Sequence, residues 1–423
     1  MKTEDIYGEA LQQFQSYVGD AVATIERALV ERPDYVRGHA FRAGALMTFG
    51  EQRYAEAAKT SVEAAERLVG RASDNDRGLV AAIRKLVDGD WDAGCRLLDR
   101  VLVDYPRDAF TLQVAHLFDF FRGDALNLRN RIERVLPAWS EGDTGYSYLL
   151  GMHAFGLEEC NQYDEADEAA QRALALQPKD GWAVHAAVHV REMKGKVDDG
   201  IALLEQRKGD WAPDNGFAYH NWWHLALFHL DRSDLPRVLE LFDRSIYPER
   251  SDISFQLVDA TALLWRLFVL GENVGTRWEQ LADAWTSKLD AERGFYAFND
   301  AHAMMAFAAT RREDAAARLL RDMEAATAGR GSNAMMTREV GLPVVRGLIA
   351  FAQGKNALAV EELLAVRDGA YRFGGSHAQR DLITLTLIVA AQRAGQHTLA
   401  RHFLAERLVQ RPGGGLGARL AAR

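Results

Sequence analysis

Apolar positions recur along this chain with helical spacing, in segments that end at a proline. Alanine-rich amphipathic stretches run into Pro33, Pro106, Pro178 and Pro412. The first three of these prolines lie 73 and 72 residues apart (106−33, 178−106), which is two periods of about 34 residues with a little slack, the length of a tetratricopeptide repeat. The pattern therefore predicts helical hairpins that stack as repeats.

Six copies of one turn-and-helix pattern support this prediction. Each has a glycine or asparagine, then an aromatic or long residue, then acidic and small residues before an apolar stripe. Glycine or asparagine is expected to end the first helix of each hairpin in the left-handed conformation. The copies begin at or next to Gly50, Gly89, Asn161, Gly195, Gly354 and Gly395.

The fold class predicted is all-α, a tetratricopeptide-type α-solenoid that is irregular in the middle. We expect one continuous repeat domain over residues 1–423, with regular repeats at about 20–210, polar and irregular repeats at about 211–345, and C-terminal repeats at about 346–410. Such a stack needs no linker, because each repeat contacts only its neighbours. β-strand alternation is absent over any useful length, which excludes nucleotide-binding folds built on parallel sheets.

Composition and charge narrow the function. The chain has 423 residues, 48% of them apolar and 26% charged, as in an ordinary folded protein. A net charge of −9 argues against a nucleic-acid groove and an anionic membrane surface. The acidic start and an apolar run of only ten residues at 382–391 do not fit a signal peptide or a membrane span. We expect a cytoplasmic protein with no evident organic cofactor, since no phosphate-binding loop or dinucleotide motif occurs.

Histidine and tryptophan concentrate in one part of the sequence. Seven of the nine tryptophans fall between Trp182 and Trp285, together with five of the twelve histidines, namely His185, His189, His220, His224 and His229. Most of the tryptophans recur at helical spacing and are expected to be core. Trp222 and Trp223 point about 100° apart, so Trp223 is a candidate for lining a binding groove.

Two pairs of histidines have the spacing that a metal site on helices requires. His185 and His189 are i, i+4 neighbours, and so are His220 and His224, so that each pair lies on one helix face. Imidazoles at this spacing can bind a zinc-like divalent ion, with His220 and His224 as the metal candidates and Glu192 as a further ligand or a general base. The alternative is that each imidazole is a hydrogen-bonded core residue, because this spacing also arises by chance.

A second polar segment, Asn299, Asp300 and His302, opens an otherwise apolar helix. We expect Asn299 or Asp300 to cap that helix and His302 to face inward. His302 is then a candidate catalytic residue, with Asn299 and Asp300 as candidate ligand contacts.

A third polar segment begins another helix at residues 374–381. Ser376 and Gln379 fit a capping box, although Gln379 is also a candidate ligand contact. Arg380 just inside a helix start can bind a carboxylate or phosphate, and pairing with Asp381 or another acid is the alternative.

These segments as a set resemble the family of tetratricopeptide repeat protein 38. The resemblance spans most of the chain from about Pro33, and it is weaker at His185, which argues against four imidazole ligands. It implies a soluble α-helical repeat protein and no established reaction. The residues that carry it are 189–195, 220–227, 274–278, 298–302, 339–343 and 374–381.

The function predicted is binding of a small polar or anionic ligand, or a peptide, in a concave pocket lined by histidine and tryptophan. Asn221 and Trp223 would contact the ligand. The alternative is an enzyme, with hydrolysis the first reaction to test, in which His189, Glu192, His220, His224 and His302 act as acid–base groups or as ligands of a metal. A protein–protein scaffold is the third hypothesis, and a homo-oligomer is compatible with all three.

Overall fold

The computed structural model describes residues 3–292 and 294–422, and these residues are helical with no β-strand. One isolated antiparallel bridge joins Val18 to Asn215. The prediction of an all-α fold is confirmed. Over the described residues, every helix is too short or too polar to cross a bilayer.

The chain divides into two compact units. Unit 1 comprises Met1–Ala187 and Arg207–Ala218, and unit 2 comprises Val188–Gln206 and Tyr219–Arg423. The divisions fall within α11 (Gly181–Met193) and at the start of α14 (Ala218–Asp231), and each of these is one unbroken helix.

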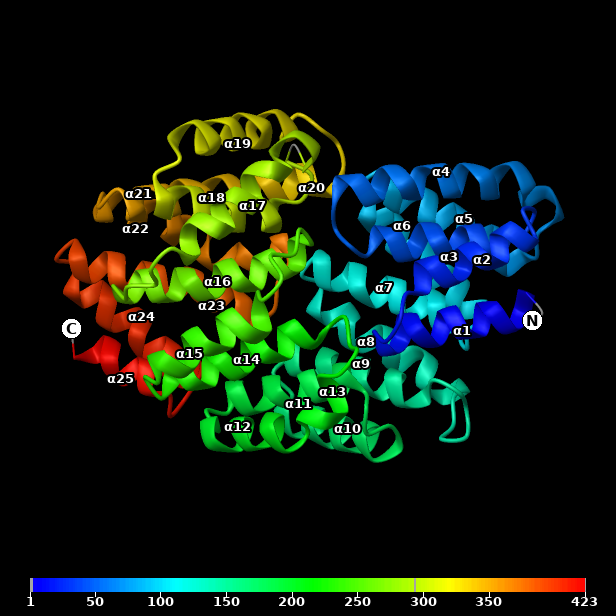
Figure 1. Ribbon diagram of the computed structural model, residues 1–423, viewed down its shortest axis with the longest axis horizontal. Helices are drawn as coiled ribbons and strands as arrows, with labels where there is room; N and C mark the ends of the chain where they lie inside the picture. Colours follow the sequence, from blue (N-terminus) through cyan, green and yellow to red (C-terminus); the bar gives the residue numbers. More distant parts are fainter. Residues whose placement is uncertain (1–2, 293, 423) are drawn as a thin grey trace. The chain divides into compact units, whose positions relative to one another are not determined.

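Unit 1 is built from consecutive antiparallel helices. Figure 1 shows α3 beside α4 and α5 beside α6 in the blue part of the chain. The helices are α1 (Thr3–Ser16), α2 (Ala21–Glu31), α3 (Val36–Met47), α4 (Gln52–Leu68), α5 (Asp74–Val87), α6 (Trp91–Asp104), α7 (Ala109–Phe121), α8 (Ala125–Val135), α9 (Tyr146–Glu159), α10 (Tyr163–Leu176), the first part of α11, and α13 (Lys208–Trp211).

Unit 2 continues the same construction. After the last part of α11 it contains α12 (Val197–Gln206), α14, α15 (Leu235–Leu241), α16 (Ser254–Leu270), α17 (Arg277–Glu292), α18 (Ala297–Thr310), α19 (Glu313–Ala326), α20 (Ser332–Met336), α21 (Leu342–Ala352), α22 (Asn356–Val366), α23 (His377–Arg393), α24 (His397–Gln410) and α25 (Gly415–Ala421). Short π-helical turns at Phe242–Ile246 and Thr337–Gly341 follow α15 and α20.

Repeat length and turn geometry agree with the tetratricopeptide-type prediction. The helices α3, α5, α7, α9, α11, α14 and α16 begin 35 to 38 residues apart, close to the tetratricopeptide length of about 34. All six turn residues expected from the sequence have positive φ, between 62° and 81°, and lie between paired helices. The helices α2, α6, α10 and α24 end within two residues of the four prolines.

Aromatic and aliphatic side chains fill the interior of each unit. In unit 1, Phe41 and Phe110 stack with ring centroids 4.3 Å apart and are fully buried. In unit 2, the buried Trp265 donates its indole N–H to Thr386 Oγ1 at 3.0 Å, which ties α16 to α23. Residues on every side of α14, α16 and α18 are buried, so that polar side chains on these helices lie inside the protein.

Candidate metal and ligand site

The histidine pairs predicted from the sequence lie on two neighbouring helices. His185 and His189 occupy successive turns of α11, and His220 and His224 occupy successive turns of α14. All four side chains are buried, with at most 8% of each residue exposed. We call these residues the histidine cluster.

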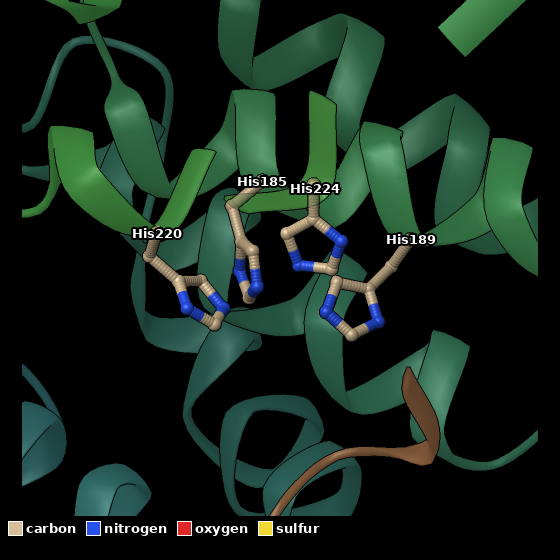
Figure 2. Close-up of side chains that lie close together, drawn as sticks. All are labelled: His185, His189, His220 and His224. Atoms are coloured by element: carbon tan, nitrogen blue, oxygen red, sulfur yellow. The ribbon is translucent and has the colours of Figure 1, made fainter. Parts of the chain in front are cut away.

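The imidazoles of the cluster come close to one another. One ring nitrogen from each of His189, His220 and His224 lies within 4.8 Å of the others, and Figure 2 shows these three rings gathered together. Among the three histidines of unit 2, His224 lies in the middle. Its ring centroid is 4.5 Å from that of His189 and 4.9 Å from that of His220. Nitrogens bound tetrahedrally to zinc at 2.0–2.1 Å are about 3.4 Å apart, which lies within the 4.8 Å limit that holds for these ring nitrogens.

Two of the imidazole rings are hydrogen-bonded to carboxylates through Nδ1. His224 Nδ1 lies 2.8 Å from Glu192 Oε2, and His220 Nδ1 lies 2.6 Å from Asp259 Oδ2 on α16. The carboxylate oxygens accept, so each imidazole donates from Nδ1, and Nε2 is the nitrogen that can bind a metal ion. This carboxylate–histidine arrangement is the one that orients and strengthens histidine ligands in metal sites.

His189 and His224 are held in their neutral form. Burial is the largest cause that keeps the pKa values of His189 and His224 well below the usual value. The charges of His220, His377, Arg411 and Arg380 lower the pKa of His189 further. Neutral imidazoles are the form that binds a metal ion.

Glu192 is engaged on both oxygens. Oε2 accepts from His224, and Oε1 pairs with Arg411, whose guanidinium also lies 2.7 Å from Asp381 Oδ2. Asp381 in turn accepts two hydrogen bonds from Arg407, at 2.8 and 2.9 Å. Glu192 is therefore placed to orient His224. Because both of its oxygens are engaged, this arrangement does not favour Glu192 as a metal ligand or as a general base.

A stack of three side chains continues from the cluster. The rings of His220 and Trp223 are parallel to within 15°, with centroids 5.4 Å apart. The guanidinium carbon of Arg266, on α16, lies 5.2 Å from the Trp223 ring. Trp223 is completely buried, so it packs between His220 and Arg266.

His302 is brought near this stack. It faces inward on α18 as expected, with Nδ1 2.8 Å from the carbonyl oxygen of Phe298. Burial is the main cause that lowers the pKa of His302 to about 4, and the charge of Arg266 adds to it. The carbonyl must accept, so Nδ1 of the neutral ring carries the proton.

The expected capping role of Asn299 or Asp300 is wrong. The helix begins one turn earlier, with Tyr296 at the N-cap, and its first free N–H, that of Ala297, donates to Asn333 Oδ1. Asn299 and Asp300 are both buried inside α18. Burial, followed by repulsion from Glu292 and Asp322, keeps the pKa of Asp300 well above its usual value, which favours a neutral carboxyl group.

The capping box at the start of α23 forms as predicted, with Gln379 Oε1 accepting from Ser376 N at 3.0 Å. This bond occupies one polar atom of the candidate ligand contact Gln379. Arg380 hydrogen-bonds to the Gly375 carbonyl and lies 3.2 Å from His377 Nδ1. Asp381, the neighbouring acid, is bound by Arg407 and Arg411.

Asn221, predicted to contact the ligand, is completely buried in α14. Three functional candidates have only a weak signal in the sequence. Asp259 and Arg266 are isolated charges in the apolar run of α16, and that isolation was the available signal. Arg411 precedes Pro412 beyond the end of α24, and its pairing with Glu192 joins positions far apart in sequence.

Comparisons with known proteins found solved structures of low sequence identity. No protein-family model matches the chain. Solved structures similar to it include the APC/C hetero-tetramer Cut9–Hcn1, at 12% identity over 89% of this chain and 68% of that one, with a TM-score of 0.42. The human IFIT1 dimer with m7Gppp-AAAA has 12% identity over 99% of this chain and 100% of that one, with a TM-score of 0.42. Yeast Tom70 has 13% identity over 81% and 85%, with a TM-score of 0.39.

The chain's own hairpins and turns therefore define its class. It is a helical-repeat protein of tetratricopeptide type, and its described residues include a buried histidine cluster.

Proposed function

We propose that this repeat protein binds a divalent transition-metal ion through His189, His220 and His224, and a small polar or anionic ligand beside it. One observation carries the proposal: three buried imidazoles of unit 2 adjoin one another, and two of them are fixed by carboxylates at Nδ1. Nitrogen-only donor sets of this kind suit zinc, cobalt, nickel and copper, and do not suit magnesium or calcium.

His185 decides which kind of metal site this is. It lies one turn before His189 on α11, in unit 1. Four imidazoles would close a tetrahedral site, as in structural zinc sites, whereas three would leave a position open for water or ligand, as in catalytic ones. The proposal of a bound ligand favours three imidazoles, with His185 packed against Trp182 and Phe217.

A hydrolase is the second candidate. Its support is the positive charge near His189, where Arg411 and Arg380 are close enough to lower the pKa of that imidazole. A metal ion lowers the pKa of bound water to about 7, and the arginines would attract an anionic substrate. A scaffold for protein or peptide partners remains the third candidate, supported by the repeat fold. We also propose that the protein belongs to the tetratricopeptide repeat protein 38 family. We propose in addition that it is cytoplasmic and forms homo-oligomers.

Metal analysis of matched histidine variants tests it. We expect the purified full chain to hold about one equivalent of metal after loading and desalting, and His224→Gln to lose it. His229→Gln is the control, because His229 lies on the same helix, is similarly buried, and belongs outside the cluster. Circular dichroism checks that both variants fold. A wild-type chain that retains no metal, or a His224→Gln variant that retains as much as His229→Gln, contradicts the proposal.

A further inference from the structure

Arg266 differs in its hydrogen-bond partners from the two other arginines that are buried to a similar degree. Arg131, Arg266 and Arg407 are 1%, 2% and 5% exposed. Arg131 makes two hydrogen bonds to Asp119, and Arg407 makes two to Asp381. Arg266 donates only to the carbonyl oxygens of Ala262 at 3.0 Å and Ala378 at 2.5 Å, and no carboxylate among the described residues pairs with it.

The acidic residues that act on Arg266 already have other hydrogen-bond partners. Asp381, Asp259 and Asp231 act on Arg266 from beyond ion-pair distance. Asp381 is bound by Arg407 and Arg411, Asp259 holds His220, and Asp231 accepts from the backbone N–H of Leu416. Burial lowers the pKa of Arg266 to about 10, so the guanidinium stays charged at neutral pH. A buried charge with no countercharge is strongly unfavourable.

Two further buried polar atoms, on Trp223 and on His302 of the contacting helix α18, lack partners among the described residues. Trp223, over whose ring the guanidinium lies, has an indole N–H that is buried with no acceptor among the described residues. His302, within the electrostatic reach of Arg266, has a buried Nε2 with no donor among them. Because Nδ1 of His302 donates to Phe298, Nε2 of the neutral ring is an acceptor.

These groups together define the chemistry of a ligand. We propose that Arg266 and the Trp223 indole N–H bind a small oxyanion whose own hydroxyl donates to His302 Nε2. A short hydroxycarboxylate and a hydrogen phosphate ion share this chemistry, since each has an anionic oxygen for the guanidinium and an O–H for the imidazole. The inference rests on the proposed ligand-binding function of unit 2, and it does not need the metal ion.

Ligand pairs that differ by one hydroxyl test the inference in the unmodified chain. The chelator-treated full-length protein is titrated by calorimetry with glycolate and with acetate, and separately with phosphate and with sulfate, at constant ionic strength. We expect glycolate and phosphate to bind, and acetate and sulfate to bind about tenfold more weakly or not at all, because a lost hydrogen bond in a buried site is seldom replaced. Equal responses within both pairs, or no response to any of the four ions, overturn the inference.

Three variants assign the binding to these side chains. Arg266→Met should lower the affinity for glycolate by tenfold or more, since it removes a charge-assisted hydrogen bond. His302→Phe should remove the preference for glycolate over acetate, and Trp223→Phe should weaken both. The control is Arg393→Met, because Arg393 also donates to a carbonyl of α16, that of Val269, from α23. If Arg266→Met does not fold, the other two variants still decide, and glycolate binding unchanged in both rejects the site.

The metal proposal and this inference can be rejected independently. Arg266→Met is expected to keep the metal content of the wild type, and His224→Gln is expected to keep the preference for glycolate. Loss of the metal with glycolate binding intact rejects the proposed metal alone, whereas stoichiometric metal with no anion binding rejects this inference alone.

Discussion

Glu192 Oε2 accepts a hydrogen bond from His224 Nδ1 at 2.8 Å across the α11–α14 pair, and its other oxygen pairs with Arg411. The carboxylate is thus fixed between a guanidinium from the C-terminal end of α24 and the central imidazole of the cluster. Glu192→Gln preserves the shape and removes the charge. Outer carboxylates of this kind affect metal affinity by about 10- to 100-fold, and we expect a loss of that size in a competition titration with a chromophoric chelator.

The control for that variant is Glu205→Gln. Glu205 is an acid of unit 2 whose partner, Arg237, lies outside the cluster. We expect it to leave metal affinity unchanged. If Glu192→Gln and Glu205→Gln bind the metal equally well, Glu192 does not orient His224 for a metal ion.

Acid should destabilise the protein through His302. The folded pKa is about 4 and the unfolded one is about 6.5, so between these pH values the unfolded state binds the extra proton. The stability contributed is complete above pH 6.5 and is lost as the pH falls toward 4. Between pH 7 and pH 5 the wild type should lose about 2 kcal/mol more of unfolding free energy than His302→Phe, measured by urea denaturation. Equal pH dependence in the two proteins contradicts the neutral, buried imidazole.

Asp180 in unit 1 should make the protein less stable as the pH rises, the opposite of the effect of His302. Its Oδ1 caps α11 through the N–H groups of Trp182 and Ala183, while burial raises its pKa to about 7. Because the unfolded pKa is about 3.9, the folded state binds the extra proton between these values, and stability falls as the pH rises toward 7. Asp180→Asn keeps an acceptor for the cap and removes the charge. It should be more stable than wild type at pH 8, by up to about 4 kcal/mol, and lose this advantage near pH 4.

Two turn glycines separate backbone strain from close packing. Gly195 and Gly395 have φ of 64° and 72°. A Cβ on Gly195 would overlap the carbonyl oxygen of Pro412, whereas no atom of the other described residues, its two chain neighbours apart, lies within 4 Å of a Cβ on Gly395. Gly395→Ala should cost about 1–2 kcal/mol from the left-handed conformation alone, and Gly195→Ala about 1–3 kcal/mol more because the backbone must move. Equal melting temperatures for the two variants contradict the contact between α11 and the segment after α24.

The regular hairpins could be predicted because their turns use residues with a known backbone preference. Gly50 and Asn161 both occupy the left-handed conformation, which these residue types favour. In the irregular region the same conformation is adopted by Ser233 and Arg311, which give no such signal. The hairpins there therefore looked divergent in sequence although their turns keep the same backbone geometry.

The candidate site could be predicted where its chemistry is local. The spacing of His220 and His224 places both on one face of a helix, and the structure brings His189 beside them. The partners of these residues depend on tertiary packing: Asp259 and Arg266 reach the site only because α16 packs against its neighbours. Asp300 was misassigned because Tyr296 begins its helix one turn earlier than the capping pattern indicated.

X-ray absorption spectroscopy of the zinc-loaded full chain tests the central claim most directly. Three nitrogen ligands at about 2.0–2.1 Å are predicted for zinc bound by His189, His220 and His224, and His185→Ala should leave this number unchanged. A first shell of oxygen alone, or zinc that a desalting column removes from the wild type, would contradict the account.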